Sequence, residues 1–274
     1  MSGDRLQTCF ERCQNEKRAA LIGYLTAGDP DPATSEKLLC ALAEQVDILE
    51  IGMPFSDPMA DGPSIQAASE RALAAGTHMD DVFHLAATVR AAHPDIGIVF
   101  MGYANVVYVM GYEKFAEAAR RHGADGVLLV DIPPEESHDL DAALKAEGLH
   151  SIRLLAPTSS EERRKLVTAN ASGFIYYVSL TGITGADMGE TGSVRQQVDE
   201  IRRLTDLPIC VGFGIKTPEQ AANIGDFADG VVIGSHFVAQ IAGHLSDSCA
   251  MIRAVGDAAG TMLEALRAGS GRRE

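Results

Sequence analysis

The sequence has little of three features, each of which is typical of a different class of proteins: clustered basic residues, long apolar runs and a cysteine framework. Its 274 residues carry a net charge of −15, and the short basic clusters at 163–165 and 272–273 form no stripe. Nucleic acids and anionic membrane surfaces both require concentrated lysine and arginine. Neither is therefore an expected partner.

No apolar run approaches the roughly 18 residues of a membrane span. The polar, mixed-charge N-terminus also lacks the apolar core of a signal peptide. The five cysteines show no metal-site or disulfide spacing. Cys9 and Cys13 stand four residues apart on an expected helix, which brings two thiols near each other, and reduced thiols are the default interpretation. We therefore expect a soluble, cytoplasmic protein.

Eight short apolar, β-branched runs recur along the chain. They are continuous rather than alternating, which is typical of strands buried on both faces of a parallel sheet. Stretches rich in Ala, Leu, Glu and Arg with helical spacing separate them. The expected strands are residues 19–25, 46–52, 97–103, 126–132, 150–156, 174–180, 208–214 and 230–235.

Eight strands alternating with helices over about 250 residues predict an α/β protein, a (β/α)₈ TIM barrel. A doubly wound open sheet is the alternative, but the first turn, LTAGDPDPAT, contains no G-x-G-x-x-G. Extra helices are expected before the first strand, at 4–15, and after the second, at 63–75. No linker or repeat interrupts the pattern, so we expect one domain, 1–268, and a flexible tail, 269–274.

Three carboxylates stand close together after the second expected strand. Glu50 ends the apolar run, and Asp57 and Asp61 follow in a segment rich in proline and glycine. Active sites of such barrels lie at the C-terminal ends of the strands, where partial loss of water raises a carboxyl pKa toward the useful range. Simpler interpretations are an ion pair for Glu50, an Asx-turn or helix cap for Asp61, and a turn for Asp57.

Three glycine-rich turns follow the last strands: TGITGA at 181–186, GFGI at 212–215 and Gly234-Ser235. Loops at these positions commonly form a phosphate pocket from backbone N–H groups and a helix N-terminus. Ser235 is suited both to cap the following helix and to donate to a phosphate oxygen. A phosphorylated small molecule, held by backbone dipoles, is therefore the expected substrate.

Other mechanisms find little support at the strand ends. Only Lys216 lies near enough for a Schiff-base aldolase, and the eight histidines show no metal-ligand spacing. The sequence contains neither a nucleophile elbow nor a P-loop. The residues alone therefore predict acid–base chemistry by carboxylates on a phosphorylated small molecule, without a metal.

The run LEIGMPFSDPMADGP, residues 49–63, closely resembles the signature of the tryptophan synthase α-subunit family. The similarity continues through LTAGDPD, MGYAN, VDIPPEES, GITGA, GFGI and GS, over nearly the whole chain. Indole-3-glycerol phosphate synthase and related barrels share the architecture but lack this run. The resemblance implies a lyase that cleaves indole-3-glycerol phosphate to indole and glyceraldehyde 3-phosphate in tryptophan biosynthesis.

The resemblance also implies roles for individual residues. Glu50 would protonate the indole ring carbon and handle the glycerol hydroxyl proton, while Asp61 would bind the indole N–H. Thr184 would touch Asp61 when the loop after the sixth strand closes. This retro-aldol route requires no metal and no cofactor in this chain. The implied phosphate site is Gly185, Gly214, Gly234 and Ser235, and the implied indole pocket is Tyr24, Met101, Tyr103, Leu128, Val130, Ile152 and Tyr176.

The family pattern further implies a partner, a pyridoxal-phosphate β subunit that receives indole within an α₂β₂ tetramer. Asp57 and Pro58 would face that subunit. A stand-alone indole-releasing lyase and a catalytically silent regulatory subunit remain alternatives, and the intact Glu50 and Asp61 pair speaks against the second. Tyr24, Val130 and His236 depart from residues common in the family, but both carboxylates stay in place.

Overall fold

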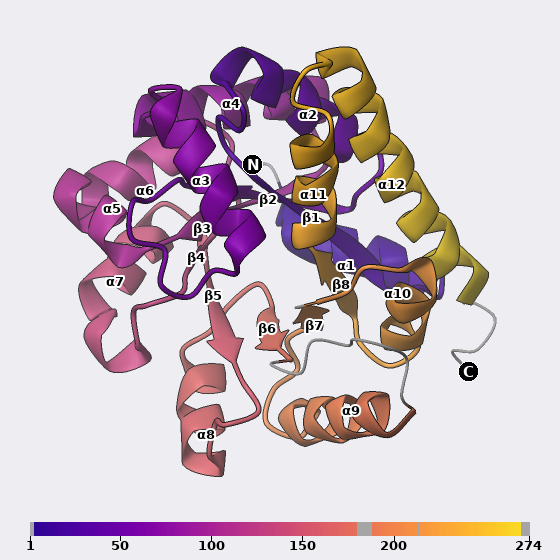
Figure 1. Ribbon diagram of the computed structural model, residues 1–274. Helices are drawn as coiled ribbons and strands as arrows, with labels where there is room; N and C mark the ends of the chain where they lie inside the picture. Colours follow the sequence, from indigo (N-terminus) through magenta and orange to yellow (C-terminus); the bar gives the residue numbers. More distant parts are fainter. Residues whose placement is uncertain (1–2, 180–187, 213, 270–274) are drawn as a thin grey trace.

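Eight parallel strands close into a barrel in the computed structural model, which describes residues 3–179, 188–212 and 214–269. Neighbouring strands pair in sequence order, and β8 pairs back onto β1 (Figure 1). The predicted (β/α)₈ barrel is confirmed, and each strand overlaps its expected run. The strands are β1 Ala20–Thr26, β2 Ile48–Gly52, β3 Gly97–Gly102, β4 Gly126–Leu129, β5 His150–Leu155, β6 Ile175–Val178, β7 Ile209–Gly212 and β8 Gly230–Ile233.

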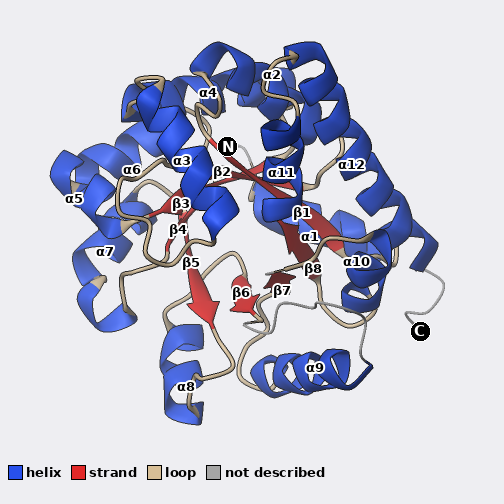
Figure 2. Cartoon of the chain, in the orientation of Figure 1, coloured by secondary structure: helices blue, strands red, loops and turns tan. Residues whose placement is uncertain are grey.

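Helices surround the strands (Figure 2). The extra helices expected before the first strand and after the second are α1 and α3. None of the helices within the described ranges is long and apolar enough to cross a bilayer. The helices are α1 Arg5–Asn15, α2 Pro32–Ala43, α3 Pro63–Ala74, α4 Met79–Ala92, α5 Ala104–Met110, α6 Tyr112–Arg121, α7 His138–Ala146, α8 Glu161–Ala169, α9 Met188–Arg202, α10 Pro218–Gly225, α11 Ser235–Gly243 and α12 Ser248–Ala268, with a 3₁₀ turn, η1, at Pro134–Glu136.

Helix α5 was not expected from the sequence. Its segment continues the apolar run of β3, and its outer face exposes Tyr108 and Val109, so it shows no polar stripe. The helix begins where Asp131, after β4, accepts the N–H of Ala104 at 2.8 Å. It ends at Gly111, whose φ of 90° is unfavourable for residues with a side chain.

The barrel interior is filled by side chains at every second strand position, as the strand period of two requires. Helix α1 closes the N-terminal end of the barrel, here called the bottom. It buries Leu6, Cys9, Phe10 and Cys13 against that interior. Burial raises the pKa of both thiols, so Cys9 and Cys13 remain protonated core residues. The buried apolar interior residues on the strands or directly beside them are Ala20, Ile22, Ile48, Val99, Leu128, Ile152, Phe174, Tyr176, Cys210 and Val232.

Aspartates at the starts of strands stabilise the bottom of the barrel. Asp47, just before β2, accepts the N–H of Leu21 on β1 at 2.9 Å. It also forms ion pairs with Arg18 at 2.6 Å and Arg12 at 2.8 Å. Asp125, before β4, repeats the arrangement, since it accepts the N–H of a β3 residue and forms ion pairs with arginines.

The Asp47 ion pairs are expected to dominate the acid sensitivity of the fold. Burial alone would raise the pKa of Asp47, but Arg18 and Arg12 outweigh it and hold that pKa below its ordinary value. Asp47→Asn should lower the free energy of unfolding by about 3–5 kcal/mol at pH 7, because it leaves the buried Arg18 guanidinium with the half-exposed Glu16 as its remaining ion-pair partner among the described residues. A depressed pKa stabilises the folded state above the ordinary value, so the difference should shrink below roughly pH 4.

Urea unfolding at pH 7 and at low pH measures this difference, with exposed Asp206→Asn as the control. A loss at pH 7 no larger than that of the control would contradict the assignment.

Candidate active site

Glu50 lies inside the barrel near the C-terminal end of β2. It pairs in register with Tyr24 on β1 and Val99 on β3. Its side chain is 0% exposed, and neither carboxyl oxygen has a hydrogen-bond partner within the described ranges. Burial raises the pKa of Glu50 to about 8. The carboxyl group is therefore neutral at pH 7 and able to donate a proton, and no ion pair holds it.

Asp61 lies in the loop between β2 and α3, which reaches the end of β3. The Tyr103 hydroxyl donates to Asp61 Oδ2 at 3.0 Å and accepts the N–H of Ala60 at 3.0 Å. Gln66 on α3 donates to the Asp61 carbonyl at 2.8 Å. Burial raises the pKa of Asp61, and the Tyr103 hydrogen bond partly offsets that rise. Its side chain does not cap α3, because Gly62 occupies the cap position without a side-chain bond.

The two carboxyl groups act on the same two buried phenols. Burial raises the pKa of Tyr24 well above its ordinary range, and the charges of Asp61 and Glu50 raise it further. Burial and then Glu50 have the same effect on the pKa of Tyr176. Both phenols thus lie within electrostatic reach of the carboxylates. Asp57, by contrast, is exposed and forms a turn, in which its carbonyl accepts the N–H of Met59 at 2.9 Å.

The predicted indole-pocket residues differ in burial. Leu128 and Ile152 are 0% and 1% exposed in the interior core, Tyr24, Tyr103 and Tyr176 are buried at 8%, 2% and 8%, and Met101 and Val130 are partly buried. Two partly buried residues of the same inward face were missed in the sequence, Leu154 on β5 and Val178 after Tyr176 on β6. Each stands two positions beyond a predicted pocket residue, so the strand period was the signal that could have found them.

The N-terminus of α11 follows directly on β8 at the mouth. Gly234 occupies the cap position without a side-chain hydrogen bond, and Ser235 is the first helical residue rather than the cap. The helix therefore presents backbone N–H groups and a positive dipole end. Gly214, after β7, has φ of 78°. Gly185 and Thr184 lie outside the described residues.

His236 follows Ser235 in the first turn of α11. It is half-buried, and its ring lies edge-on to Phe237 at 5.8 Å between centroids. Burial lowers the pKa of His236. The imidazole is therefore neutral at pH 7, and the positive potential at this helix end comes from the backbone.

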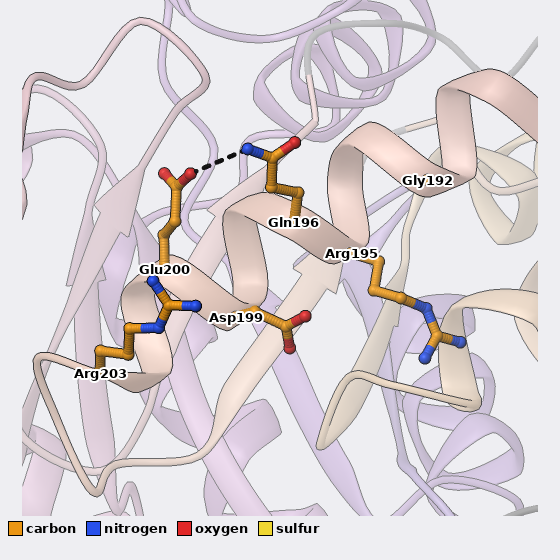
Figure 3. Close-up of a pocket in the computed structure, with 6 residues that line it drawn as sticks. All are labelled: Gly192, Arg195, Gln196, Asp199, Glu200 and Arg203. Carbon is orange, nitrogen blue, oxygen red and sulfur yellow. Dashed lines mark hydrogen bonds between the residues drawn. The ribbon is translucent and has the colours of Figure 1, made fainter.

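Two surface hollows lie away from these carboxylates. One, of about 270 Å³, lies on α9 (Figure 3), where Arg195 stacks on Phe227 and Glu200 bonds Gln196 and Arg164. The other, of about 730 Å³, lies at the bottom, beside His150 at the start of β5. The contacts around the first hollow join α9 to α8 and to Phe227, which indicates a structural role. Within the described ranges, no three His, Cys, Asp or Glu side chains converge as metal ligands would.

Comparison with known proteins identifies the family. The family model described as "Tryptophan synthase alpha chain" matches residues 10–267. The chain belongs to the tryptophan synthase alpha chain family. Its relative from Zymomonas mobilis is 50% identical over 238 residues, 86% of this chain and 87% of that protein. The one from Dechloromonas aromatica is 48% identical over 253 residues, 92% and 94% of the two chains.

Solved structures agree with this assignment. The crystal structure of the tryptophan synthase alpha chain from Legionella pneumophila matches with a TM-score of 0.88 at 36% identity, over 97% of this chain and 98% of that one. A chain of tryptophan synthase from M. tuberculosis matches with a TM-score of 0.87 at 32% identity, over 97% and 99%. The chain thus functions in tryptophan biosynthesis as an indole-3-glycerol-phosphate lyase. The alpha chain needs no cofactor, since pyridoxal phosphate belongs to the beta subunit.

The buried Glu50 carboxyl should make the alpha chain less stable as the pH rises. The pKa of Glu50 is 4.5 in the unfolded chain and about 8 in the folded chain. Between these two pH values the folded state keeps a proton that the unfolded state releases. Glu50→Gln removes this proton linkage. The variant should therefore gain stability relative to the wild type, by on the order of 3 kcal/mol between pH 5 and pH 8.

Urea unfolding at several pH values measures the gain, with the exposed Glu264→Gln as the matched control. A constant difference between variant and wild type across this interval would show that Glu50 ionises normally.

Proposed function

We propose that Glu50 is the general acid–base group of the retro-aldol cleavage. Its protonated carboxyl donates to C3 of the indole ring, which becomes an electron sink, and the bond to the glycerol carbon breaks. The hydroxyl on that carbon loses its proton to the Glu50 carboxylate and becomes the aldehyde. The observation that carries this role is a fully buried carboxyl group without a partner in the described chain, with a pKa of about 8.

We propose that Asp61 binds the indole N–H and stabilises the charge that develops on the ring. The Tyr103 hydroxyl bonds Oδ2 and leaves Oδ1 available as an acceptor. Tyr103 in turn stacks on Phe55 at 5.2 Å between centroids, so the donor is held in place. Tyr24, Met101, Leu128, Val130, Ile152 and Tyr176 complete the proposed pocket, and Thr184 is proposed to contact Asp61 on loop closure.

The substrate phosphate is proposed to bind backbone N–H groups at the start of α11, with Gly185, Gly214, Gly234 and Ser235 around it. The uncapped helix N-terminus supports this placement. A phosphate held by backbone dipoles adds no lysine or arginine beside Glu50, whose carboxyl would otherwise ionise.

Indole release from indole-3-glycerol phosphate tests the assignment of the two carboxyl groups. Glu50→Gln should lower kcat by about 10²–10⁴, the usual contribution of a positioned proton donor. The wild-type rate should fall as the pH rises above about 8, because the protonated acid is lost. Asp61→Asn should also lower kcat, because the negative charge that stabilises the ring is removed.

The control for this assay is Glu264→Gln, which should keep the wild-type rate and pH profile. A Glu50→Gln variant that is folded and as active as the wild type would overturn the role of Glu50.

We propose that the chain works with a β subunit in an α₂β₂ tetramer in the cytoplasm, as one domain, 1–268, with a tail, 269–274. The proposed contact surface contains Asp57 and Pro58. Three large apolar side chains on the same rim support it, since Met59, Tyr108 and Val109 are 80%, 69% and 79% exposed. The bond from Ala60 to Tyr103 joins this loop to the start of α5. Such an apolar group is typical of an interface.

Val109→Glu should weaken the complex with the β subunit at least tenfold, because it places a charge in the apolar centre of the contact. Isothermal titration calorimetry with a purified β subunit measures this affinity. The matched control is Leu245→Glu, since Leu245 is 52% exposed just after the C-terminal end of α11, away from the mouth. Equal affinities for the two variants would argue for the stand-alone lyase or for a different contact surface.

A further inference from the structure

The ring of Tyr24 spans the distance between the proposed phosphate site and the strand that carries Glu50. A Cβ atom added to Gly234, at the start of α11, would lie 3.2 Å from Tyr24 Cδ1. A Cβ atom added to Gly52 on β2 would lie 2.2 Å from the Tyr24 hydroxyl oxygen. Glycine at both positions lets the ring lie flat across this part of the mouth. The hydroxyl end lies over Gly52, on the same strand face as Glu50 and one step nearer the mouth.

The hydroxyl of Tyr24 has the chemistry of a neutral hydrogen-bonding group. It lies 3.1 Å from Thr26 Oγ1, and either oxygen can be the donor. Burial and the charges of Asp61 and Glu50 keep its pKa well above the ordinary value, so the O–H persists at working pH. The Tyr24 and Thr26 hydroxyls together can therefore both donate to and accept from a third hydroxyl group.

The substrate of the proposed function connects these two ends. With its phosphate at α11 and its ring carbon at Glu50, its three-carbon chain must cross Tyr24. That chain carries two hydroxyls, and the one on the reacting carbon must give its proton to Glu50. We propose, resting on the proposed function, that the Tyr24 hydroxyl, oriented by Thr26, binds the hydroxyl on the middle carbon and selects for its presence.

The alternative is that Tyr24 only packs as the apolar floor of the mouth. The two roles predict different sets of ligands whose kcat/KM or Kd changes when the Tyr24 hydroxyl oxygen is removed. A packing role affects every ligand that lies over the ring. Loss of a hydrogen bond affects only ligands that carry the middle hydroxyl. When a ligand lacks that hydroxyl, removing the Tyr24 oxygen leaves no ligand group unpaired.

Tyr24→Phe removes the oxygen and keeps the ring. For indole-3-glycerol phosphate, kcat/KM should fall about three- to tenfold, as expected for one neutral hydrogen bond. For the analogue that lacks only the middle hydroxyl, wild type and variant should have equal kcat/KM. The Kd of 3-(indol-3-yl)propyl phosphate, which lacks both hydroxyls, should also be equal for the two proteins.

Two further variants complete the experiment. Thr26→Val should lower kcat/KM in the same direction and with the same ligand dependence, by a smaller factor, because the Tyr24 hydroxyl loses its orienting partner. The control is Tyr177→Phe, whose buried ring faces the helices outside the barrel and should leave all three values unchanged.

Three results would overturn the inference. The first is that Tyr24→Phe lowers kcat/KM equally for the substrate and the deoxy analogue, which would mean packing alone. The second is that Tyr24→Phe leaves kcat/KM for the substrate unchanged, which would mean that the hydroxyl takes no part. Both results count against the inference alone when the wild-type chain binds the propyl phosphate and releases indole from the substrate, because the proposed function then holds. The third result is a wild-type chain that neither binds the propyl phosphate nor releases indole, which would overturn the proposed function together with the inference.

Discussion

The proposed chemistry depends on one carboxyl group that is buried without a partner. Burying a carboxylate in a barrel interior is costly, so Glu50 keeps its proton to a pKa of about 8. That state survives only while no positive charge lies beside it. The surroundings meet this condition, since burial alone shifts the pKa of Glu50, the phenols of Tyr24 and Tyr176 within its electrostatic reach are neutral, and His236 on α11 is neutral as well. An anion held by backbone N–H groups at α11 fits the same condition.

At the bottom of the barrel, by contrast, buried carboxylates are paired with arginines. Asp47 is 4% exposed, yet Arg18 and Arg12 hold its pKa below the ordinary value. Asp125 is similarly surrounded by arginines. Asp47 lies just before β2 and Glu50 lies on it, three residues later, yet their pKa values shift in opposite directions, because Asp47 has arginines and the N–H of Leu21 as partners and Glu50 is shifted by burial. The fold thus has paired carboxylates that stabilise one end of the barrel and, toward the other end, an unpaired carboxyl group to which the proposed chemistry is assigned.

The sequence revealed those features of the fold and site that depend on strand order and strand ends. Eight continuous apolar runs predicted the barrel, and the position of Glu50 at the end of the second run predicted its burial. The degree of burial inside the barrel was not predictable, because it depends on the stagger between strands, so the predicted pocket contains the fully buried Leu128 and Ile152 and leaves out the partly buried Leu154 and Val178. Helix α5 was missed because its exposed face is apolar. That face is part of the contact surface proposed for the β subunit.

A mouth that contains neutral hydroxyls is suited to discriminate among hydroxylated substrates without disturbing its acid. A lysine in place of Tyr24 would also bind a chain hydroxyl, but its charge would lower the pKa of Glu50 and ionise the proton donor. A phenol or a threonine hydroxyl binds just as directionally and changes the local potential little. Discrimination then follows from the groups left unpaired by a wrong ligand. The Tyr24, Thr26 and Tyr103 hydroxyls around Glu50 and Asp61 are therefore consistent with one electrostatic requirement of the proposed mechanism, an acid that remains protonated until the ring carbon takes its proton.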